Sequence, residues 1–166
     1  VGIAVALMLI SPELVLIFGS PKYREAVYVI PPVAASVFFI FIYNILSMPQ
    51  FYYEKTQFLM AASMAAAGAN VVLNFIFIRL FGYIAAGYTT LACYMLYSVG
   101  HYIVSKRILV NEGIQENLMS PGFLVACSVF LIGASIICNL IFPYRILRYA
   151  ILLASAGLVF WKKELL

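Results

Sequence analysis

The residues that could do chemistry in this chain lie in three polar stripes, each repeated at helical spacing within an apolar segment. At about 100° per residue, the first stripe occupies one sector of a helix and contains Ser36, Tyr43, Ser47, Gln50 and Glu54. We do not expect this face to point at lipid, because an unpaired polar group in hydrocarbon is strongly destabilising. Two roles for this stripe stay open: interhelical hydrogen bonding, or the lining of a hydrated ligand cavity. The length of Gln50 and the charge of Glu54 favour the cavity.

A second stripe follows in the next apolar segment. It contains Thr56, Ser63, Asn70 and Asn74. The surrounding stretch 61–70 is built mostly of Ala, Ser and Gly, a composition that lets membrane helices approach closely. Helix packing is therefore favoured over a ligand site for this stripe.

A third stripe is rich in tyrosine and contains Tyr83, Thr90, Tyr94, Tyr97 and His101. Its rings and hydroxyls suit either helix contacts or a sugar ligand. A histidine within a membrane segment is a candidate functional residue by default. His101 lies less than two turns from the basic residues at 106–107, however, so a histidine satisfied at the interface is favoured and a cavity role is kept as the alternative.

The residue inventory excludes most catalytic and metal chemistry. The chain has no Asp and one His, so it cannot assemble a Ser-His-Asp triad or an HExxH zinc site. It also has no GxxxxGK[ST] loop for a nucleotide phosphate. The basic residues are spread over short loops, which speaks against nucleic-acid binding. We therefore expect no catalytic residue, no metal site, no cofactor and no enzyme activity.

The elements that must position these stripes are membrane helices. Of the 166 residues, 66% are hydrophobic and 10% are charged, whereas a soluble domain carries about 25% charged residues. Four stretches lack any Lys, Arg, Asp or Glu, and each exceeds the roughly 20 residues that cross a bilayer as a helix: 26–53, 56–78, 80–105 and 117–144. The sequence predicts an all-α, polytopic membrane protein.

We expect six transmembrane segments in a single membrane lobe. They cover about 1–18, 26–51, 57–78, 83–105, 122–142 and 146–161, with a polar linker at 106–120. In the first segment, an apolar run 1–10 meets Pro12 and continues as a short amphipathic stretch. We expect Arg145 and Arg148, in the first turns of the last helix, to extend to the interface.

The chain opens inside apolar membrane material. Ten helical residues span only about 15 Å, half a bilayer. We therefore expect a transmembrane helix that is cut, and a chain that is the C-terminal part of a longer protein. Basic residues divide evenly between the two sides of the predicted topology, so charge alone does not orient it.

Two stretches resemble a known family. PELVLIFGSPKYREA (12–26) is similar to the segment that leads into the eighth helix of polysaccharide transporters, with Pro12, Phe18, Gly19, Tyr23 and Ala26 at matching positions. NVVLNFIFIRLFGYIAAGYTT (70–90) resembles the pattern across helices nine and ten, with Asn70, Asn74, Gly82, Ala86, Gly87 and Thr90 matching. Arg79 stands where the family usually has proline and Ala85 where it usually has glycine. The family is the oligosaccharide-lipid flippase branch of the MOP (multidrug/oligosaccharidyl-lipid/polysaccharide) superfamily.

This resemblance implies the C-terminal lobe of a two-lobed transporter in a bacterial or archaeal cytoplasmic membrane. Such a protein moves polyprenyl-pyrophosphate-linked oligosaccharide by alternating access, for O-antigen, capsule, lipopolysaccharide or exopolysaccharide synthesis. The implied partners are the bilayer, the lipid-linked oligosaccharide, the missing N-terminal lobe, and the polysaccharide polymerase and chain-length machinery. The implied topology places loops 52–56 and 106–120 in the cytoplasm.

These expectations assign three sets of residues. The substrate-cavity candidates are Ser36, Tyr43, Asn44, Ser47, Gln50, Tyr94, Tyr97 and His101. The gate candidates are Glu54 and Lys55, where Glu54 pairs with Lys55 or with a cation of the missing lobe. The helix-packing candidates are Asn70, Asn74, Gly82, Gly87 and Thr90.

Three alternatives stay open. A cation-coupled multidrug exporter of the same superfamily would place acidic residues deep in its lobes, and here no Asp exists and Glu54 lies near a helix end. A lipid II flippase is harder to separate, because its basic residues belong largely to the other half. The third alternative, from a different class, is a membrane-embedded sugar polymerase or ligase. Such enzymes usually carry long extracytoplasmic loops, whereas the longest predicted loop here is the linker 106–120.

Overall fold

The computed structural model describes residues 1–19, 21–114 and 118–163. Every element in this described part of the chain is helical, as predicted. The elements are α1 (Gly2–Phe18), the 3-10 helix η1 (Pro21–Tyr28), α2 (Ile30–Tyr52), α3 (Thr56–Phe81), α4 (Ala85–Asn111), α5 (Pro121–Ile141) and α6 (Arg145–Lys163).

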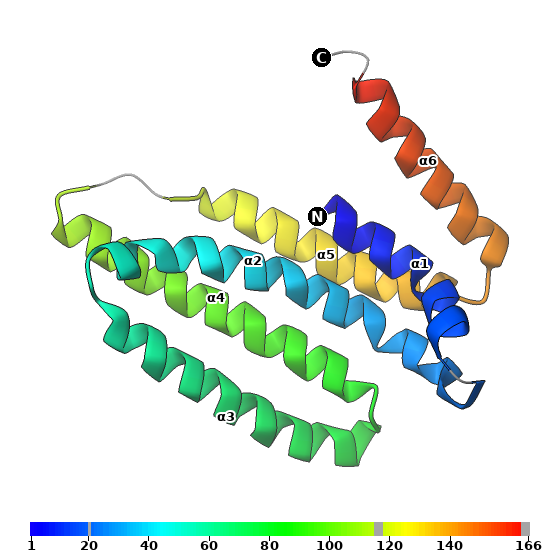
Figure 1. Cartoon of the computed structure of the whole chain (residues 1–166), viewed down its shortest axis with the longest axis horizontal. Coiled ribbons are helices and arrows are strands. Elements are labelled where there is room, and N and C mark those ends of the chain that lie inside the picture. Colours follow the sequence, from blue (N-terminus) through cyan, green and yellow to red (C-terminus); the bar gives the residue numbers. More distant parts are fainter. Residues whose placement is uncertain (20, 115–117, 164–166) are drawn as a thin grey trace.

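Helix α2 is the centre of the bundle. It contacts α1 and α5 on one side and α4 on the other, and α4 in turn carries α3 (Figure 1). The short turns between them make α2, α3 and α4 antiparallel neighbours. Helix α6 leans away from the bundle, and its main contacts among the described residues are with α1 and α5 (Figure 1).

The helix boundaries differ from the predicted ones where proline and charge were misleading. Pro12 lies inside a continuous α1, so the apolar run and the amphipathic stretch after it form one described helix. Helix α2 begins at Ile30 instead of 26, because η1 occupies the preceding residues and Pro31 fits the first turn, where no amide donor is needed.

The expected linker 106–120 begins later than predicted. Its first six residues extend α4 to Asn111, because Lys, Arg and Leu favour helix and both Ile108 and Leu109 are buried. Gly113, with a φ of 80°, then ends the helix. Residues 115–117 of this linker lie outside the described residues.

Three described helices, α2, α3 and α5, are long and apolar enough to cross a membrane, and α1 is a shorter apolar helix. Large apolar side chains are exposed along all three, among them Phe41, Phe75 and Phe130. A surface of this kind is suited to lipid rather than to water. The structure therefore supports a helical membrane protein with three candidate spans among the described residues.

Candidate functional site

A polar cavity of about 470 Å³ lies between α2, α3 and α4, and we call it the tyrosine cavity. Its lining draws on all three predicted stripes: Tyr43 from α2, Ser63 and Asn70 from α3, and Thr90, Tyr94 and Tyr97 from α4. The stripes meet because α4 lies between the other two helices. Small side chains of α3, Ala66 and Ala67, leave room for the cavity.

Three tyrosines form one wall of this cavity. The ring of Tyr43 stacks on Tyr94 with a centroid distance of 6.4 Å and an interplanar angle of 10°. The ring centroid of Tyr97 lies 4.7 Å from that of Tyr43, and the Tyr97 hydroxyl is 2.6 Å from the hydroxyl of Ser63. The wall therefore presents aromatic faces and phenol hydroxyls, two features suited to the apolar and polar sides of a sugar.

A buried polar cluster joins α2 to α4 next to the tyrosine wall. Gln50 and His101 are both 0% exposed. The amide nitrogen of Gln50 lies 2.9 Å from Nδ1 of His101 and donates to Ser105 Oγ at 3.0 Å, and Ser105 donates to the carbonyl of Leu46. The ring of Tyr97 meets His101 edge-on at 4.4 Å. The structure thus places these two cavity candidates in a helix contact behind the cavity.

Three further cavity candidates on α2 bond to their own helix. Ser36 donates to Val33, Ser47 to Asn44, and Asn44 to Ile40, each through a backbone carbonyl. Ser36 and Ser47 are buried, whereas Asn44 is exposed. Of the eight cavity candidates, Tyr43, Tyr94 and Tyr97 are the ones that the tyrosine cavity brings together.

The contact between α3 and α4 depends on the second stripe. Asn74 donates to Asn70 Oδ1 at 2.9 Å and accepts from Thr89 Oγ1 at 2.5 Å. The sequence pointed to Thr90, which lines the cavity, and missed Thr89 one position earlier. The helical spacing of α4 could have identified Thr89, because this residue lies on the face of α4 that meets α3.

The two glycines assigned to packing have different roles. A Cβ on Gly87 would lie 2.8 Å from Cγ of Pro32 and 3.0 Å from the carbonyl oxygen of Val29, so Gly87 lets α4 approach α2. Gly82 ends α3 with a φ of 77°, and in the described part of the chain its Cβ position has no neighbour within 4 Å. Gly82 therefore serves the turn rather than a helix contact.

The gate candidates lie in a tight turn at the end of α2. Both Glu54 and Lys55 are exposed, and within the described residues they form no ion pair with each other. The backbone amide of Lys55 donates to the Gln50 backbone carbonyl at 2.8 Å, and that of Glu54 donates to the Phe51 backbone carbonyl at 3.1 Å. This is a Schellman motif, in which Glu54, with a φ of 56°, stands where glycine is usual.

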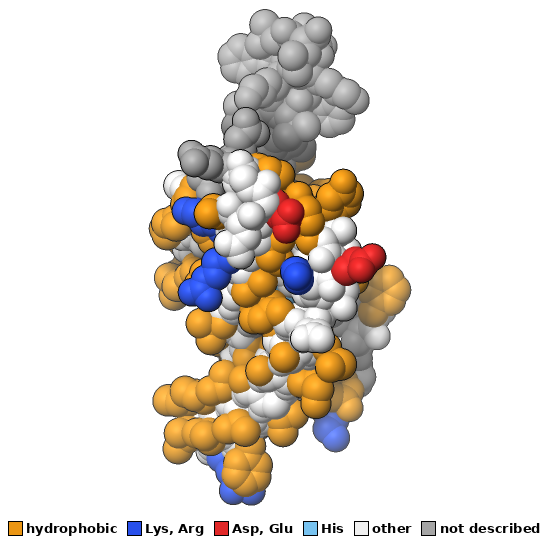
Figure 2. All heavy atoms as spheres, turned by 90° about the vertical axis from the view of Figure 1, so that its left-hand side faces the viewer, with side chains coloured by type: hydrophobic (Ala, Val, Ile, Leu, Met, Phe, Trp, Pro, Cys, Tyr) orange, Lys and Arg blue, Asp and Glu red, His pale blue; other side chains and the backbone are white. Residues whose placement is uncertain are grey.

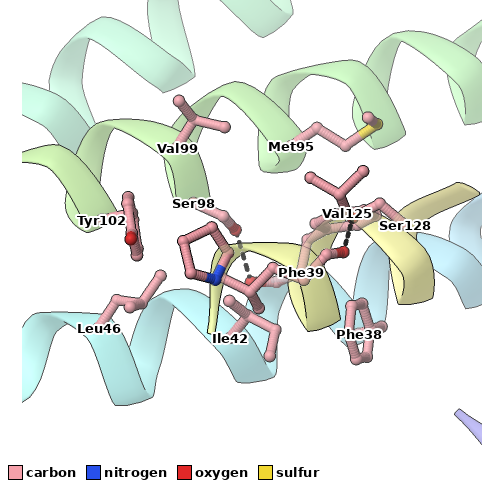
Figure 3. A pocket seen from close by; sticks show the side chains of 12 residues that line it. Phe38, Phe39, Ile42, Leu46, Met95, Ser98, Val99, Tyr102, Val125 and Ser128 are labelled. Carbon is pink, nitrogen blue, oxygen red and sulfur yellow. Dashed lines mark hydrogen bonds between the residues drawn. The ribbon is translucent and has the colours of Figure 1, made fainter. Parts of the chain in front are cut away.

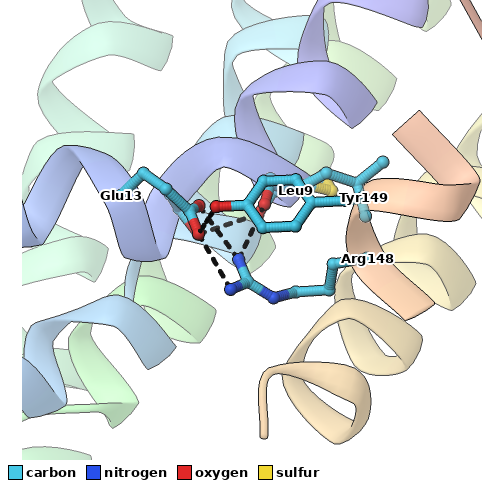
Figure 4. Close-up of polar contacts among 6 residues, drawn as sticks. Leu9, Glu13, Arg148 and Tyr149 are labelled. Carbon is cyan, nitrogen blue, oxygen red and sulfur yellow. Dashed lines mark hydrogen bonds and ion pairs between the residues drawn. The ribbon is translucent and has the colours of Figure 1, made fainter. Parts of the chain in front are cut away.

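An ion pair that the sequence did not predict fastens α6 to α1 (Figure 4). Arg148 is 2% exposed and donates to the two carboxylate oxygens of Glu13 at 2.9 and 3.0 Å, and also to the Leu9 carbonyl. Tyr149 donates to the same carboxylate at 2.8 Å. The expectation that Arg148 reaches the interface is wrong, because Glu13 supplies a counter-charge inside the bundle.

The groups that line the tyrosine cavity suit the binding of a polar ligand. It offers hydroxyl, amide and aromatic groups, and none of its lining side chains is a carboxylate, histidine or cation. In the described part of the chain, no group of three or more His, Cys, Asp or Glu side chains is placed to hold a metal. Comparison with protein-family models, curated proteins and solved structures found no match to this chain.

Proposed function

We propose that this chain is the C-terminal lobe of a two-lobed MOP-type transporter that flips polyprenyl-pyrophosphate-linked oligosaccharide across the cytoplasmic membrane for cell-surface polysaccharide synthesis. The observation that carries this proposal is the tyrosine cavity between α2, α3 and α4. The resemblance of 12–26 and 70–90 to polysaccharide transporters supports the family. The proposal also takes all six long helices as membrane spans.

The cavity has the size and the chemistry for a sugar. Its volume of about 470 Å³ lies within the range of about 300–1,000 Å³ that small-molecule sites occupy. Tyr43 and Tyr94 can contact the apolar face of a sugar ring, while Asn70, Thr90 and Tyr97 can exchange hydrogen bonds with its hydroxyls. A drug exporter coupled to cations would need acidic groups, and the lining of this cavity has none.

Helix α4 is the main support for a span beyond the three apolar ones. Its 27 residues reach about 40 Å at 1.5 Å per residue, which exceeds the hydrocarbon core of about 30 Å. Its mean hydropathy is lowered by the stripe of Thr90, Tyr94 and Tyr97, which faces the cavity instead of lipid. A helix that shields its polar face in this way can cross a bilayer.

Glu54 supports a gate at the predicted cytoplasmic end of this lobe. A side chain other than glycine in the left-handed region is unfavourable by about 1–2 kcal/mol, so its presence there is a hint of function. Its carboxylate is exposed and free of Lys55 in this structure. In the proposed transporter it meets a cation of the other lobe when the cytoplasmic side closes.

The test is flipping of a fluorescent polyprenyl-pyrophosphate disaccharide in liposomes that contain the whole protein. Tyr97→Phe and Thr90→Val each remove one cavity hydroxyl, worth about 0.5–1.5 kcal/mol, so each should slow flipping by about two- to twelvefold. Tyr52→Phe, at an exposed tyrosine beyond the cavity, is the matched control. Equal rates for all three variants, or equal flipping of the lipid without its sugar, would overturn the proposal.

A further inference from the structure

A second hollow lies on the opposite side of the α2–α4 pair. It has a volume of about 240 Å³ and is bounded by α2, α4 and α5 (Figure 3), and we call it the α5 groove. Phe39 and Leu46 of α2, Val99 and Tyr102 of α4, and Val125 of α5 are among its lining residues. Val99 and Val125 are more than half exposed, so the groove is open at its rim.

The α5 groove offers an occupant few groups for hydrogen bonding. Its lining is aliphatic and aromatic apart from two serines and a tyrosine. Ser98 donates to the Phe39 carbonyl at 2.9 Å, and Ser128 donates to the Leu124 carbonyl at 2.7 Å. Neither serine has a hydroxyl hydrogen left to donate to a sugar, whereas a hydrocarbon chain needs no polar partner.

One end of the groove lies next to polar and basic side chains. Tyr102 lies there, and its buried hydroxyl has no hydrogen-bond partner within the described residues. Lys106 follows one turn later on the same face of α4, next to Arg107, and both are exposed. Across the groove, Pro121 starts α5, whose N-terminus carries a partial positive charge. Figure 2 looks onto this end of the molecule and shows Lys and Arg side chains beside apolar ones, with acidic side chains near them.

An apolar groove that ends at cationic groups matches an amphiphile with a long chain and an anionic head. We propose that the α5 groove holds the isoprene units nearest the head group of the lipid-linked sugar, with its phosphates at Lys106 and Arg107. This inference rests on the proposed function and adds a second subsite to it.

The positions of the two hollows fit one substrate. Tyr97, in the tyrosine cavity, precedes Lys106 by nine residues of α4, about 14 Å along the helix axis. A pyrophosphate at Lys106 therefore leaves a short sugar within reach of the tyrosines, around the end of the α2–α4 pair. Lys55 lies in the α2–α3 turn at this same end.

The test fills the groove and follows what occupies it. Val125→Trp places an indole at the rim, and Val129→Trp is the matched control, because Val129 is on the same helix and 65% exposed against 63% for Val125 but does not line the groove. The whole protein, in nanodiscs, is photolabelled with a polyprenyl phosphate that carries a diazirine in its chain. Phosphatidylglycerol with a diazirine in its acyl chain is the comparison probe.

We expect the polyprenyl probe to label 121–128, and Val125→Trp to reduce this labelling at least fivefold while Val129→Trp leaves it unchanged. Lys106→Gln and Arg107→Gln should each weaken binding about fivefold, the usual effect of one basic residue at an anionic surface. If Val125→Trp does not fold, Val99→Trp fills the groove from α4.

Three results would overturn the inference: no label at 121–128, equal labelling of that stretch by phosphatidylglycerol, or no loss with the groove-filling variant. Flipping of lipid-linked sugar by a protein with an unlabelled groove would refute the chain site and leave the proposed function intact. Labelling of the groove by the polyprenyl probe, in a protein that moves no sugar, would support the chain site and refute the proposed function.

Discussion

Replacing Glu13 with glutamine should loosen α6 from the bundle, because it removes the counter-charge of a buried guanidinium. Among the described side chains of α6, Arg148 is the buried one, so this contact dominates the docking of the helix. Removing one partner of a buried ion pair typically destabilises by about 3–5 kcal/mol. The new side-chain amide would retain one acceptor oxygen, and Glu13 is 24% exposed, so we expect the low end, about 3 kcal/mol. That is a change of more than a hundredfold in the docking equilibrium.

The assay is a double-mutant cycle with Glu13→Gln, Arg148→Met and the two combined. Docking of α6 is followed by pulsed electron spin resonance between labels at Ile3 of α1 and Leu153 of α6, both exposed, after replacement of the three free cysteines. Each single variant should broaden the distance distribution. The double variant should recover most of the narrow distribution, because replacing both charges leaves none buried without a partner.

The cycle also contains its own refutation. If the effects of the two single changes simply add in the double variant, the charges do not interact and the bidentate pair is not what holds α6. An unchanged distance in Glu13→Gln alone would show that the apolar contacts of α6 are sufficient. Tyr149→Phe removes only a hydrogen bond to Glu13 and should have a smaller effect, about 1 kcal/mol.

Three further predictions concern stability, each measured by unfolding in mild detergent. Glu54→Gly should stabilise by about 1 kcal/mol, because glycine suits the left-handed turn, and Gly113→Ala at the equivalent turn of α4 should destabilise by a similar amount. Destabilisation by Glu54→Gly, or stabilisation by Gly113→Ala, would contradict this reasoning. Asn74→Ala should destabilise by about 0.6–2 kcal/mol, whereas Asn44→Ala, whose amide bonds within its own helix, should change little. If Asn74→Ala folds normally but abolishes transport, the stripe lines the pathway. Gln50→Leu should destabilise by about 1–3 kcal/mol through its unpaired partners on α4, and a neutral result would show that this cluster is dispensable.

The helices were predictable because their signals are local. Charge-free stretches located α2, α3 and α4, and short turns made these helices neighbours. The meeting of Tyr43 with Tyr94 and Tyr97 follows from the same two facts. Local signals misplaced the helix ends. The charged stretch after Ser105, for example, was predicted as a loop but continues α4.

The fate of a polar stripe was not predictable from its spacing. Periodicity shows that Tyr43 and Gln50 share a face, but the distance to the opposing helix decides whether a cavity or a contact forms there. Tyr43 borders open space and Gln50 bonds directly to α4. The pair of Glu13 and Arg148 was hidden for another reason, since 135 residues separate them along the chain and no period connects them.

The two hollows share the α2–α4 pair as a common wall, and the contacts of that wall show which element can move. Ser98 bonds to the Phe39 carbonyl, Gln50 bonds to Ser105, and Gly87 brings the two backbones close together. Helix α3, by contrast, is described throughout and has no buried residue. Its polar ties to α4 are the Asn74–Thr89 and Ser63–Tyr97 hydrogen bonds, each worth only about 1 kcal/mol. Of the three walls of the tyrosine cavity, α3 is therefore the one whose displacement requires the least free energy, and access to this cavity should change by movement of α3 against a fixed α2–α4 pair.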